Sequence, residues 1–381
     1  MLVSKEKNMC CGCSSCTSSC PVKAIEIRKD EEGFDYPYID ENKCIKCNKC
    51  KLVCPLISNK DRNSELLATF AVKNKKNDIR MNSRSGGVFT ALSDFILEKN
   101  GVVYGAISED NIVFHERGSN SQERDKMRGS KYVQSSMKNC FEKIKQDLDN
   151  NLFVLFSGTS CQVDGLYSFL RKDYNNLFTV DIVCHGVPSP LVYNDYRKWR
   201  EKIIKSKCVS FNFRNKKDYG WREHIETLSF EDGKRVDSKI YTNIFYSDYI
   251  LRPSCYNCKY KKIVHPADIT IADYWNIENI LPKFDDNHGV SLVLINNMKG
   301  KELFESVETN LEFVSTNIEE SMQTPLYKSQ DLPANRQQFW DDYQNLEFSD
   351  LIKKYHFATY RDIFNGKLYV VKSYIKKILI K

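Results

Sequence analysis

The sequence lacks the features that mark membrane and secreted proteins. No window reaches the roughly 18 consecutive apolar residues that a membrane-spanning helix requires. The opening segment, Met1 to Lys7, becomes polar after three positions and contains no apolar core of a signal peptide. We therefore expect a cytoplasmic protein in a reducing compartment.

An excess of charge of one sign is also missing. Lys and Arg total 57 against 50 Asp and Glu, and the formal net charge is only +7. Because the chain has no concentrated basic stripe and no nucleic-acid-binding motif, we expect no nucleic-acid partner. No Ser-His-Asp or paired-carboxylate arrangement argues for hydrolysis.

Cysteine, in contrast, is abundant, with 15 residues. Eight of them form two strings with the same gaps of two, two and three residues, each followed by proline: Cys10, Cys13, Cys16, Cys20 and Pro21, then Cys44, Cys47, Cys50, Cys54 and Pro55. This is the bacterial ferredoxin arrangement, in which the fourth cysteine of each string binds the other string's cluster. The predicted ligand sets of the two 4Fe-4S clusters are Cys10, Cys13, Cys16 and Cys54, and Cys44, Cys47, Cys50 and Cys20.

Two other interpretations explain these strings less well. Structural zinc usually binds two knuckles separated by a longer loop, whereas here three cysteines fall within seven residues. Disulfides are disfavoured because the cysteine count is odd, Cys10 and Cys11 are adjacent, and no secretory signal precedes them. The strings therefore predict a protein that carries electrons.

Composition divides the chain into a small cluster module and a larger body. The module covers 1–58, with short strands at 24–27 and 34–39, and a polar boundary follows at 58–64. Predicted strands then lie at 67–72, 102–107, 152–156 and 177–183, with helices at 87–98 and 161–170. We predict an α/β body, a mixed sheet with flanking helices, after a small α+β ferredoxin-like module. The body is expected to comprise 59–150 and 151–320, with a helical extension at 321–381.

Two glycine turns of the body precede helices. Ser85-Gly86-Gly87 lies before one predicted helix, and Ser157-Gly158-Thr159 lies between a buried strand and the next helix. Helix N-terminal amides exposed by such turns favour a phosphate, although an ordinary tight turn is an equally good interpretation. Neither turn is a G-x-G-x-x-G fingerprint, so the turns alone name no cofactor.

Four further cysteines form a second group in the body. Cys161 begins a predicted helix, Cys184 follows a buried strand, and Cys255 and Cys258 share a loop, so one sheet edge can gather them. Their spacing leaves two interpretations open: a third 4Fe-4S cluster, or buried structural cysteines with a zinc knuckle. The remaining cysteines, expected to be ordinary thiols, are Cys11, Cys140 and Cys208.

Six segments in order carry a family resemblance: Ser85 to Gly87, Gly129 to Val133, Leu155 to Gln162, Cys184 to Pro190, Ser254 to Cys258, and Asp268 to Trp275. Together they resemble the coenzyme F-420 hydrogenase/dehydrogenase beta-subunit family over nearly the whole chain to about residue 320. The resemblance implies a flavoprotein that binds FAD and a 4Fe-4S cluster. The third cluster's ligands would be Cys161, Cys184, Cys255 and Cys258. The flavin-pocket candidates would be Ser85, Gly86, Gly87, Lys131, Ser157, Gly158 and Thr159.

The chain departs from this family pattern at several positions. Ser160 stands where the family commonly has proline, Ala272 where it has glycine, and Asn276 where glycine often follows the tryptophan. His265-Pro266-Ala267 replaces the basic residue often found shortly before Asp268. Members with a two-cluster module also occur among bacterial proteins linked to cell-surface polysaccharide synthesis. The resemblance therefore leaves the acceptor open between a coenzyme F-420-like molecule and a substrate of that synthesis.

These features predict an iron–sulfur, flavin-dependent oxidoreductase. A ferredoxin or another redox protein supplies electrons to the N-terminal clusters, and FAD passes them to a small-molecule two-electron acceptor. Lys131 and His185 are candidate catalytic residues. For Lys131 the alternative is a solvated surface lysine. For His185 a hydrogen bond from the imidazole to a thiolate or backbone carbonyl is favoured over proton donation. The main alternative function is a non-catalytic module that relays electrons to a partner enzyme, and a non-redox polysaccharide-modifying enzyme is a weaker one.

Two more segments have open interpretations. Phe211 to Trp221 combines aromatic and basic residues, which suits an acceptor pocket or, slightly better, a strand and its loop. Leu368 to Lys381 places apolar residues on one helical face and lysines opposite. Such a basic helix suits peripheral contact with a membrane or a partner, or docking on its own domain.

Overall fold

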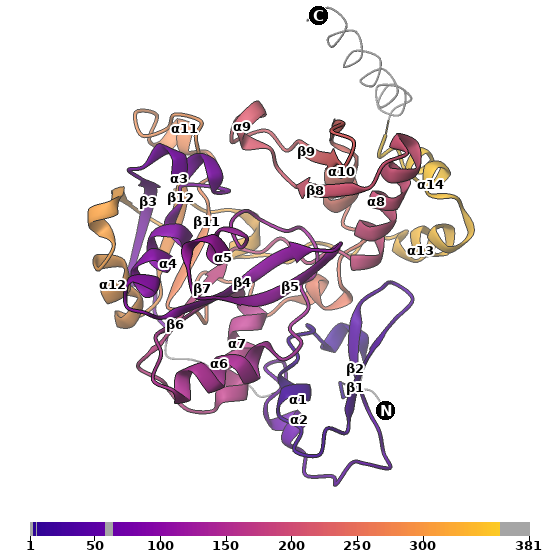
Figure 1. Cartoon of the computed structure of the whole chain (residues 1–381), viewed down its shortest axis with the longest axis horizontal. Coiled ribbons are helices and arrows are strands. Elements are labelled where there is room, and N and C mark those ends of the chain that lie inside the picture. Colours follow the sequence, from indigo (N-terminus) through magenta and orange to yellow (C-terminus); the bar gives the residue numbers. More distant parts are fainter. Residues whose placement is uncertain (1–2, 5, 58–63, 359–381) are drawn as a thin grey trace, which may run out of the picture.

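The computed structural model describes residues 3–4, 6–57 and 64–358 (Figure 1). The strands are β1 (Ile25–Lys29), β2 (Asp35–Ile39), β3 (Ala68–Asn74), β4 (Val102–Glu109), β5 (Ile112–Gly118), β6 (Val154–Thr159), β7 (Leu177–Ile182), β8 (Cys208–Asn212), β9 (Glu226–Phe230), β10 (Arg235–Ser238), β11 (Ile269–Asp273), β12 (Ser291–Ile295) and β13 (Leu311–Thr316).

The helices are α1 (Ser15–Ser18), α2 (Lys49–Leu52), α3 (Asn77–Asn82), α4 (Val88–Glu98), α5 (Ser121–Asp125), α6 (Cys140–Asp149), α7 (Ser160–Leu170), α8 (Pro190–Ile204), α9 (Lys216–Tyr219), α10 (Ile240–Tyr246), α11 (Ile277–Ile280), α12 (Met298–Glu305), α13 (Arg336–Asn345) and α14 (Phe348–Lys354). Short 3-10 helices are η1 (Lys7–Met9), η2 (Pro253–Asn257), η3 (Glu308–Asn310) and η4 (Thr324–Leu326).

The central sheet has eight strands in the order β13-β3-β12-β11-β7-β6-β4-β5. Strands β4, β6, β7 and β11 are parallel to their neighbours within this group, and the outer strands pair antiparallel. This mixed sheet with flanking helices confirms the predicted fold class. The carboxyl ends of β6, β7 and β11 meet at one edge, which is where open α/β sheets bind ligands.

Helices cover both faces of this sheet (Figure 1). Val103 and Leu155 pack with α4 and α12 in one hydrophobic core, whereas Tyr104 and Phe156 pack with α6 and α7 in another. Successive residues of a strand point to opposite faces, so β4 and β6 supply side chains to both cores. This double burial is the physical reason for the near-continuous apolar runs in the sequence.

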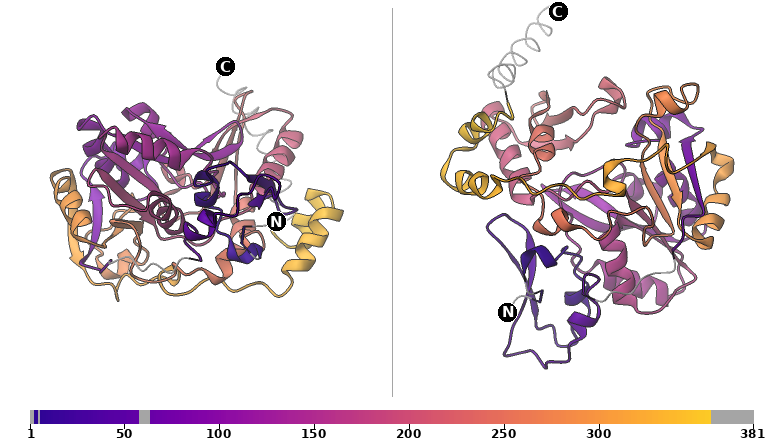
Figure 2. Two further views of the ribbon diagram at one scale, coloured as in Figure 1. Left: turned by 90° about the horizontal axis from the view of Figure 1, so that it is seen from below. Right: turned by 180° about the vertical axis from the view of Figure 1, so that it is seen from behind.

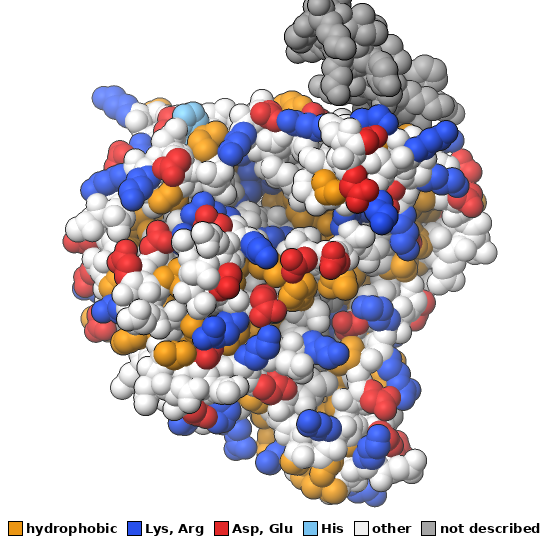
Figure 3. Space-filling view, in the orientation of Figure 1, with side chains coloured by type: hydrophobic (Ala, Val, Ile, Leu, Met, Phe, Trp, Pro, Cys, Tyr) orange, Lys and Arg blue, Asp and Glu red, His pale blue; other side chains and the backbone are white. Residues whose placement is uncertain are grey.

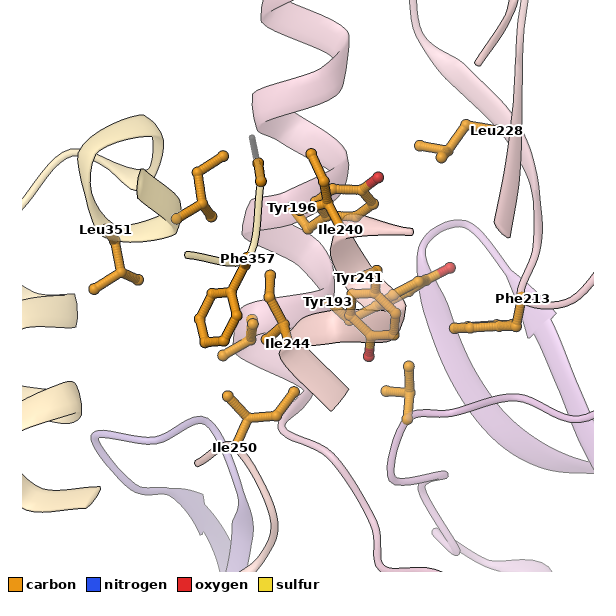
Figure 4. Packing of buried hydrophobic residues seen from close by; sticks show 14 of the residues in the cluster. Tyr193, Tyr196, Phe213, Leu228, Ile240, Tyr241, Ile244, Ile250, Leu351 and Phe357 are labelled. Carbon is orange, nitrogen blue, oxygen red and sulfur yellow. The ribbon is translucent and has the colours of Figure 1, made fainter. Parts of the chain in front are cut away.

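A second packing unit combines α8, the β10-β9-β8 sheet, α10, α13 and α14. Its core is rich in aromatic residues, because Tyr193 and Tyr196 of α8 lie beside Tyr241 of α10 (Figure 4). Leu351 of α14 packs in the same cluster. Phe213, which follows β8, packs in this core as well. The core thereby holds the loop after β8 in a defined position.

The cysteine-rich region lies below the body in Figure 1 and at the same edge in the right-hand view of Figure 2. Its strands β1 and β2 form an antiparallel hairpin, and α1 contacts α7 of the body. The buried Arg252 joins the two parts, because its Nε donates to the Cys10 carbonyl at 2.6 Å and its Nη1 to Gln134 Oε1 at 2.7 Å. Its guanidinium also lies 4.2 Å from the ring centroid of Tyr36.

In the described part of the chain, no helix is both long and apolar enough to cross a membrane. Acidic and basic side chains are interspersed over the face in Figure 3, in keeping with the balanced charge of the sequence. The predicted terminal helix, Leu368 to Lys381, and most of the predicted boundary at 58–64 lie outside the described residues.

Candidate functional site: two cysteine groups and a large cavity

The two N-terminal cysteine strings adopt the same backbone path. Gly12 and Ser14 have φ angles of 73° and 66°, and the equivalent Lys46 and Asn48 have 55° and 59°. Each string then enters a short helix, α1 or α2. The sequence duplication is therefore also a structural duplication, as expected of paired cluster-binding loops.

The thiols predicted for the first cluster are neighbours. Burial raises the pKa of Cys16 well above its usual range, and the negative charges of Cys13, Cys10 and Cys54 raise it further. Burial also raises the pKa of Cys54 to about 11, with Cys13 and Cys10 contributing. The structure thus brings Cys54 of the second string to the cysteines of the first.

The second N-terminal group is more accessible to solvent. Cys47 is exposed, whereas Cys20, Cys44 and Cys50 are half-buried. Burial raises the pKa of Cys50, whose charged neighbours include Cys44 and Cys47. The backbone amide of Ala24 donates to Cys20 Sγ at 3.2 Å, and such donors favour negatively charged sulfur.

The four cysteines of the body line one cavity of 60 Å³. Burial raises the pKa of Cys184 to about 12, opposed by Lys261, and Cys161 and Cys258 add to the rise as neighbouring negative charges. Cys255 completes the set, with its Sγ 3.5 Å from the Val187 amide. Four thiols around one cavity are the donor set of a 4Fe-4S cluster, and the residues present fit that group. Among the described residues, no three or more His, Cys, Asp or Glu side chains form a site for a single metal ion.

Cys11, which the sequence predicts to be an ordinary thiol, also lines this cavity. Its side chain forms hydrogen bonds with Cys13 of the first string and Cys161 of the body group. Cys11 therefore lies between two predicted cluster sites. The other two leftover cysteines, Cys140 and Cys208, lie in hydrophobic cores, as ordinary buried thiols do.

A much larger cavity, of 710 Å³, opens at the carboxyl edge of the sheet. The predicted flavin-pocket residues on its wall are Ser85, Gly87, Lys131, Ser157, Gly158 and Thr159. Gly86 is set behind this wall, because its amide donates to Ser291 Oγ at 2.9 Å. A Cβ at Gly86 would lie 2.2 Å from the Val72 carbonyl oxygen, so glycine lets the turn pack against the sheet.

The turn before α4 presents a helix N-terminus to the large cavity. Gly87 is the N-cap, with a φ of 86°, and Val88 and Phe89 of the first turn line the cavity. Helix N-terminal amides attract anions, as the sequence interpretation of this turn requires. In the other turn, Thr159 caps α7, and its amide donates to Gln162 Oε1 at 2.9 Å. The Thr159 amide therefore already donates a hydrogen bond within the protein and is not free to donate one to a ligand.

Lys131 is not the solvated surface lysine that one sequence interpretation allowed. Its Nζ donates to the carbonyls of Lys126 and Arg128 at 2.9 and 3.0 Å. Burial lowers its pKa to about 7. A phosphate bound in the cavity would raise the pKa of this lysine, because a nearby negative charge stabilises the ammonium form.

A buried imidazole that sequence reasoning missed supports the second glycine turn. His115 of β5 contacts the Ser157 carbonyl through Nε2 and Ser135 Oγ through Nδ1, both at 3.0 Å. Gln162 Nε2 donates to the same hydroxyl at 2.9 Å. Burial lowers the pKa of His115 to about 4, so the ring is neutral at pH 7. No local sequence motif predicts this role of His115, because its hydrogen-bond partners are distant in sequence.

Cationic and aromatic side chains form another wall of the large cavity. Asp273 accepts from Arg84 at 3.3 Å and Arg214 at 2.8 Å. Burial raises the pKa of Asp273, but the two guanidiniums together with side-chain hydrogen bonds from Trp221 and Ser85 bring this pKa below its usual value. Trp221 and Trp275 stack with their ring centroids 5.5 Å apart. The Phe211 to Trp221 segment thus supplies a cavity residue, Arg214, in addition to a strand and its loop.

His185 lies on the same cavity wall. Its Nε2 is 2.6 Å from Asp248 Oδ1, and its ring packs edge-on against Phe245. The imidazole therefore pairs with a carboxylate rather than with the thiolate or carbonyl that the sequence interpretation favoured.

The two cavities share part of their walls. Residues that line both are Thr159, Cys184, Gly186, Val187 and Pro325. Cys184 is a predicted cluster ligand, so the predicted cluster site adjoins the large cavity directly.

Two parts of the chain match known protein families. Residues 9–56 match the 4Fe-4S dicluster domain, which makes the chain an iron–sulfur protein of the electron-transfer class. Residues 153–321 match the C-terminal domain of the coenzyme F420 hydrogenase/dehydrogenase beta subunit, so the body carries that domain.

Several solved chains are similar to this chain, and one of them has low sequence identity. It is a chain of the xenon-derivatized F420-reducing NiFe hydrogenase complex from Methanosarcina barkeri, with 17% sequence identity and a TM-score of 0.46. The similarity covers 78% of this chain and 95% of that chain. No curated protein matches the sequence.

Proposed function

We propose that the protein is an iron–sulfur flavoprotein oxidoreductase. It takes electrons from a ferredoxin-like donor, passes them through its 4Fe-4S clusters to FAD, and reduces a two-electron acceptor. The observation that carries the proposal is the wall shared by the two cavities, in which Cys184 belongs to both. A cluster ligand that lines the large cavity gives electrons a short path to a cofactor there.

The order of the cysteine groups supports a linear path. The group with the exposed Cys47 is open to a donor, while Cys13 packs against Gly165 of α7, in the helix that begins beside Cys161. The exposed lysines around the outer group are Lys43, Lys46, Lys49 and Lys51. A basic surface of this kind favours docking of an acidic redox protein, such as a ferredoxin.

The large cavity suits FAD in size and in charge. Its volume is 710 Å³, and its wall includes the α4 N-terminus, Lys131 and the Ser157-Gly158-Thr159 turn. A bound flavin accepts electrons singly and releases them in pairs, which is the chemistry that clusters alone do not supply. Lys131 and the α4 amides would hold its anionic groups.

The remaining wall favours an anionic acceptor. Arg84 and Arg214 share the single carboxylate of Asp273, and the Nε atoms of both arginines are buried without a hydrogen-bond partner in the described structure. A phosphate or carboxylate of the acceptor would satisfy these donors. Coenzyme F-420-like molecules and phosphorylated precursors of cell-surface polysaccharides both carry such groups. His185, held by Asp248, is positioned to move a proton at this wall.

Metal and flavin analysis after anaerobic purification tests the proposal. We expect about twelve irons per chain together with bound FAD. The twelve predicted cysteine ligands hold three 4Fe-4S clusters, and each cluster contains four irons. Cys258→Ser should remove about four irons, and Cys47→Ser about four others, with flavin retained in the latter. The matched control is Cys140→Ser, a buried core thiol that should keep every iron.

Other compositions would contradict the proposal in different ways. About eight irons and no flavin would favour a non-catalytic relay to a partner enzyme. Stoichiometric zinc would exclude both functions. With flavin present, anaerobic turnover with coenzyme F-420, nicotinamides and sugar nucleotides then identifies the acceptor.

A further inference from the structure

The small cavity has a buried imidazole in its wall. His265 is 2% exposed and lines this cavity with the four body cysteines. Its Nδ1 lies 2.9 Å from Asp181 Oδ2 and 3.0 Å from Ser160 Oγ. Its Nε2 is buried and has no hydrogen-bond partner in the described structure.

The partners of the ring determine where its protons lie. Asp181 is fully buried and accepts a hydrogen bond from Thr270 Oγ1 at 2.6 Å through its other oxygen. A carboxylate only accepts hydrogen bonds, so Nδ1 carries a proton toward Asp181. A buried carboxylate also needs a compensating positive charge, and the ion-pair partner of Asp181 is His265. In this ion pair the ring that donates from Nδ1 can carry its second N–H only at Nε2, where the described structure offers no acceptor.

The contact between Ser160 and His265 joins two departures from the family pattern. Ser160 replaces the common proline, and His265 lies in the segment that replaces the common basic residue. Their side chains touch at 3.0 Å although they are 105 residues apart.

We propose that His265 Nε2 donates a hydrogen bond to the cluster held by Cys161, Cys184, Cys255 and Cys258, and thereby favours its reduced state. The inference rests on the proposed third cluster. Reduction adds negative charge to a cluster, and a nearby N–H donor and positive charge stabilise that added charge. Leaving a buried donor unpaired is costly, and a cluster sulfur removes this cost. His265 is thus a positioning residue that sets the potential of the cluster nearest the large cavity.

The test is an EPR-monitored redox titration of the full-length, anaerobically purified protein. His265→Leu should make the cluster's equilibrium constant for reduction about tenfold smaller, which is about 59 mV for one electron. His265→Gln keeps a neutral N–H donor, so its shift should have the same sign and a smaller size. Cys258→Ser identifies which signal belongs to this cluster. His288→Gln, a histidine outside both cavities, should leave the potential unchanged.

Pulsed EPR of the unmodified protein provides a measurement that needs no variant. A weak 14N coupling and an exchangeable proton coupling at this cluster are expected from an N–H donor. Absence of both couplings, or an unchanged potential in folded His265 variants with full iron content, would overturn the inference. A strong 14N coupling that disappears with part of the iron would make His265 a ligand and also overturn it. An unmodified protein with only about eight irons would instead overturn the proposed third cluster.

Discussion

Lys131 illustrates how one half-buried lysine with a lowered pKa affects the stability of the whole protein. Burial lowers its pKa from 10.5 to about 7, so between pH 7 and the ordinary lysine value the unfolded chain binds more protons than the folded chain. Stability therefore rises with pH through this window, because folding no longer requires a buried ammonium group. A bound phosphate would weaken this trend, because it stabilises the ammonium form of Lys131 in the folded protein.

We expect Lys131→Met to remove this pH dependence in flavin-free protein. Melting temperatures measured anaerobically at pH 7 and pH 9.5 should differ less in the variant than in the unmodified chain. The control is Lys138→Met, which removes an exposed lysine nearby. Equal pH responses of all three proteins would show that the Lys131 ammonium group is not buried in solution.

At the scale of elements, α7 connects the first cysteine string to the body. Gly165 lies in its interior, and a Cβ there would be 2.8 Å from Cys13 Cβ and 2.9 Å from Ser15 Oγ. Ser15 Oγ also donates to the Gly165 carbonyl at 2.8 Å. The helix therefore needs glycine at the point where the string approaches it, despite the low helix propensity of glycine.

Gly165→Ala tests this close approach. In an ordinary helix the change stabilises by roughly 0.5–1 kcal/mol, but here overpacking against Cys13 should destabilise by about 1–3 kcal/mol. Anaerobic thermal unfolding measures the sign, and iron analysis should show loss of iron from the first cluster. Ser168→Ala on the same helix, without this contact, is the control. A stabilised Gly165→Ala protein with full iron content would contradict the packing shown here.

Elements with a strong local pattern could be predicted well from the sequence. The apolar runs at 152–156 and 177–183 became β6 and β7, and the glycine turn before Val88 became the start of α4. The role of the segment after β8 was harder to predict. Its Arg214 pairs with Asp273, which lies 59 residues further along the chain. Local pattern reports burial and periodicity, but it does not report which distant side chain completes an ion pair.

At the scale of the whole molecule, an ion pair joins the hairpin of the cysteine-rich region to α13. Arg336 Nη1 donates to Glu32 Oε1 at 2.7 Å, and Nε donates to Tyr256 Oη at 2.9 Å. Each charged side chain is 12% exposed. Burial raises the pKa of Glu32 even though Arg336 opposes the shift.

Arg336→Gln should loosen this contact and destabilise the protein by about 1–3 kcal/mol at pH 8, because it leaves Glu32 half-buried and unpaired. The raised pKa of Glu32 makes the loss smaller at pH 5, where more of the carboxyl is protonated. Hydrogen exchange should increase in β1 and β2. Lys328→Gln, which removes an exposed pair with Asp331, should change neither property. Unchanged exchange in the hairpin of Arg336→Gln would show that other contacts hold the region in place.

The sequence by itself determined the iron–sulfur class and the α/β body, because spacing, glycine and apolar periodicity are local properties of a chain. The crossed assignment of the N-terminal cysteines stays a prediction. Only the tertiary structure decided that Cys11 lies between two cysteine groups and that His115 supports a glycine turn. It also decided that His265 contacts Asp181, although the two residues are 84 positions apart in the sequence. Such meetings follow from how strands are ordered in the sheet and how the cysteine-rich region docks on α7. Long-range packing determines both, so no short stretch of sequence encodes them.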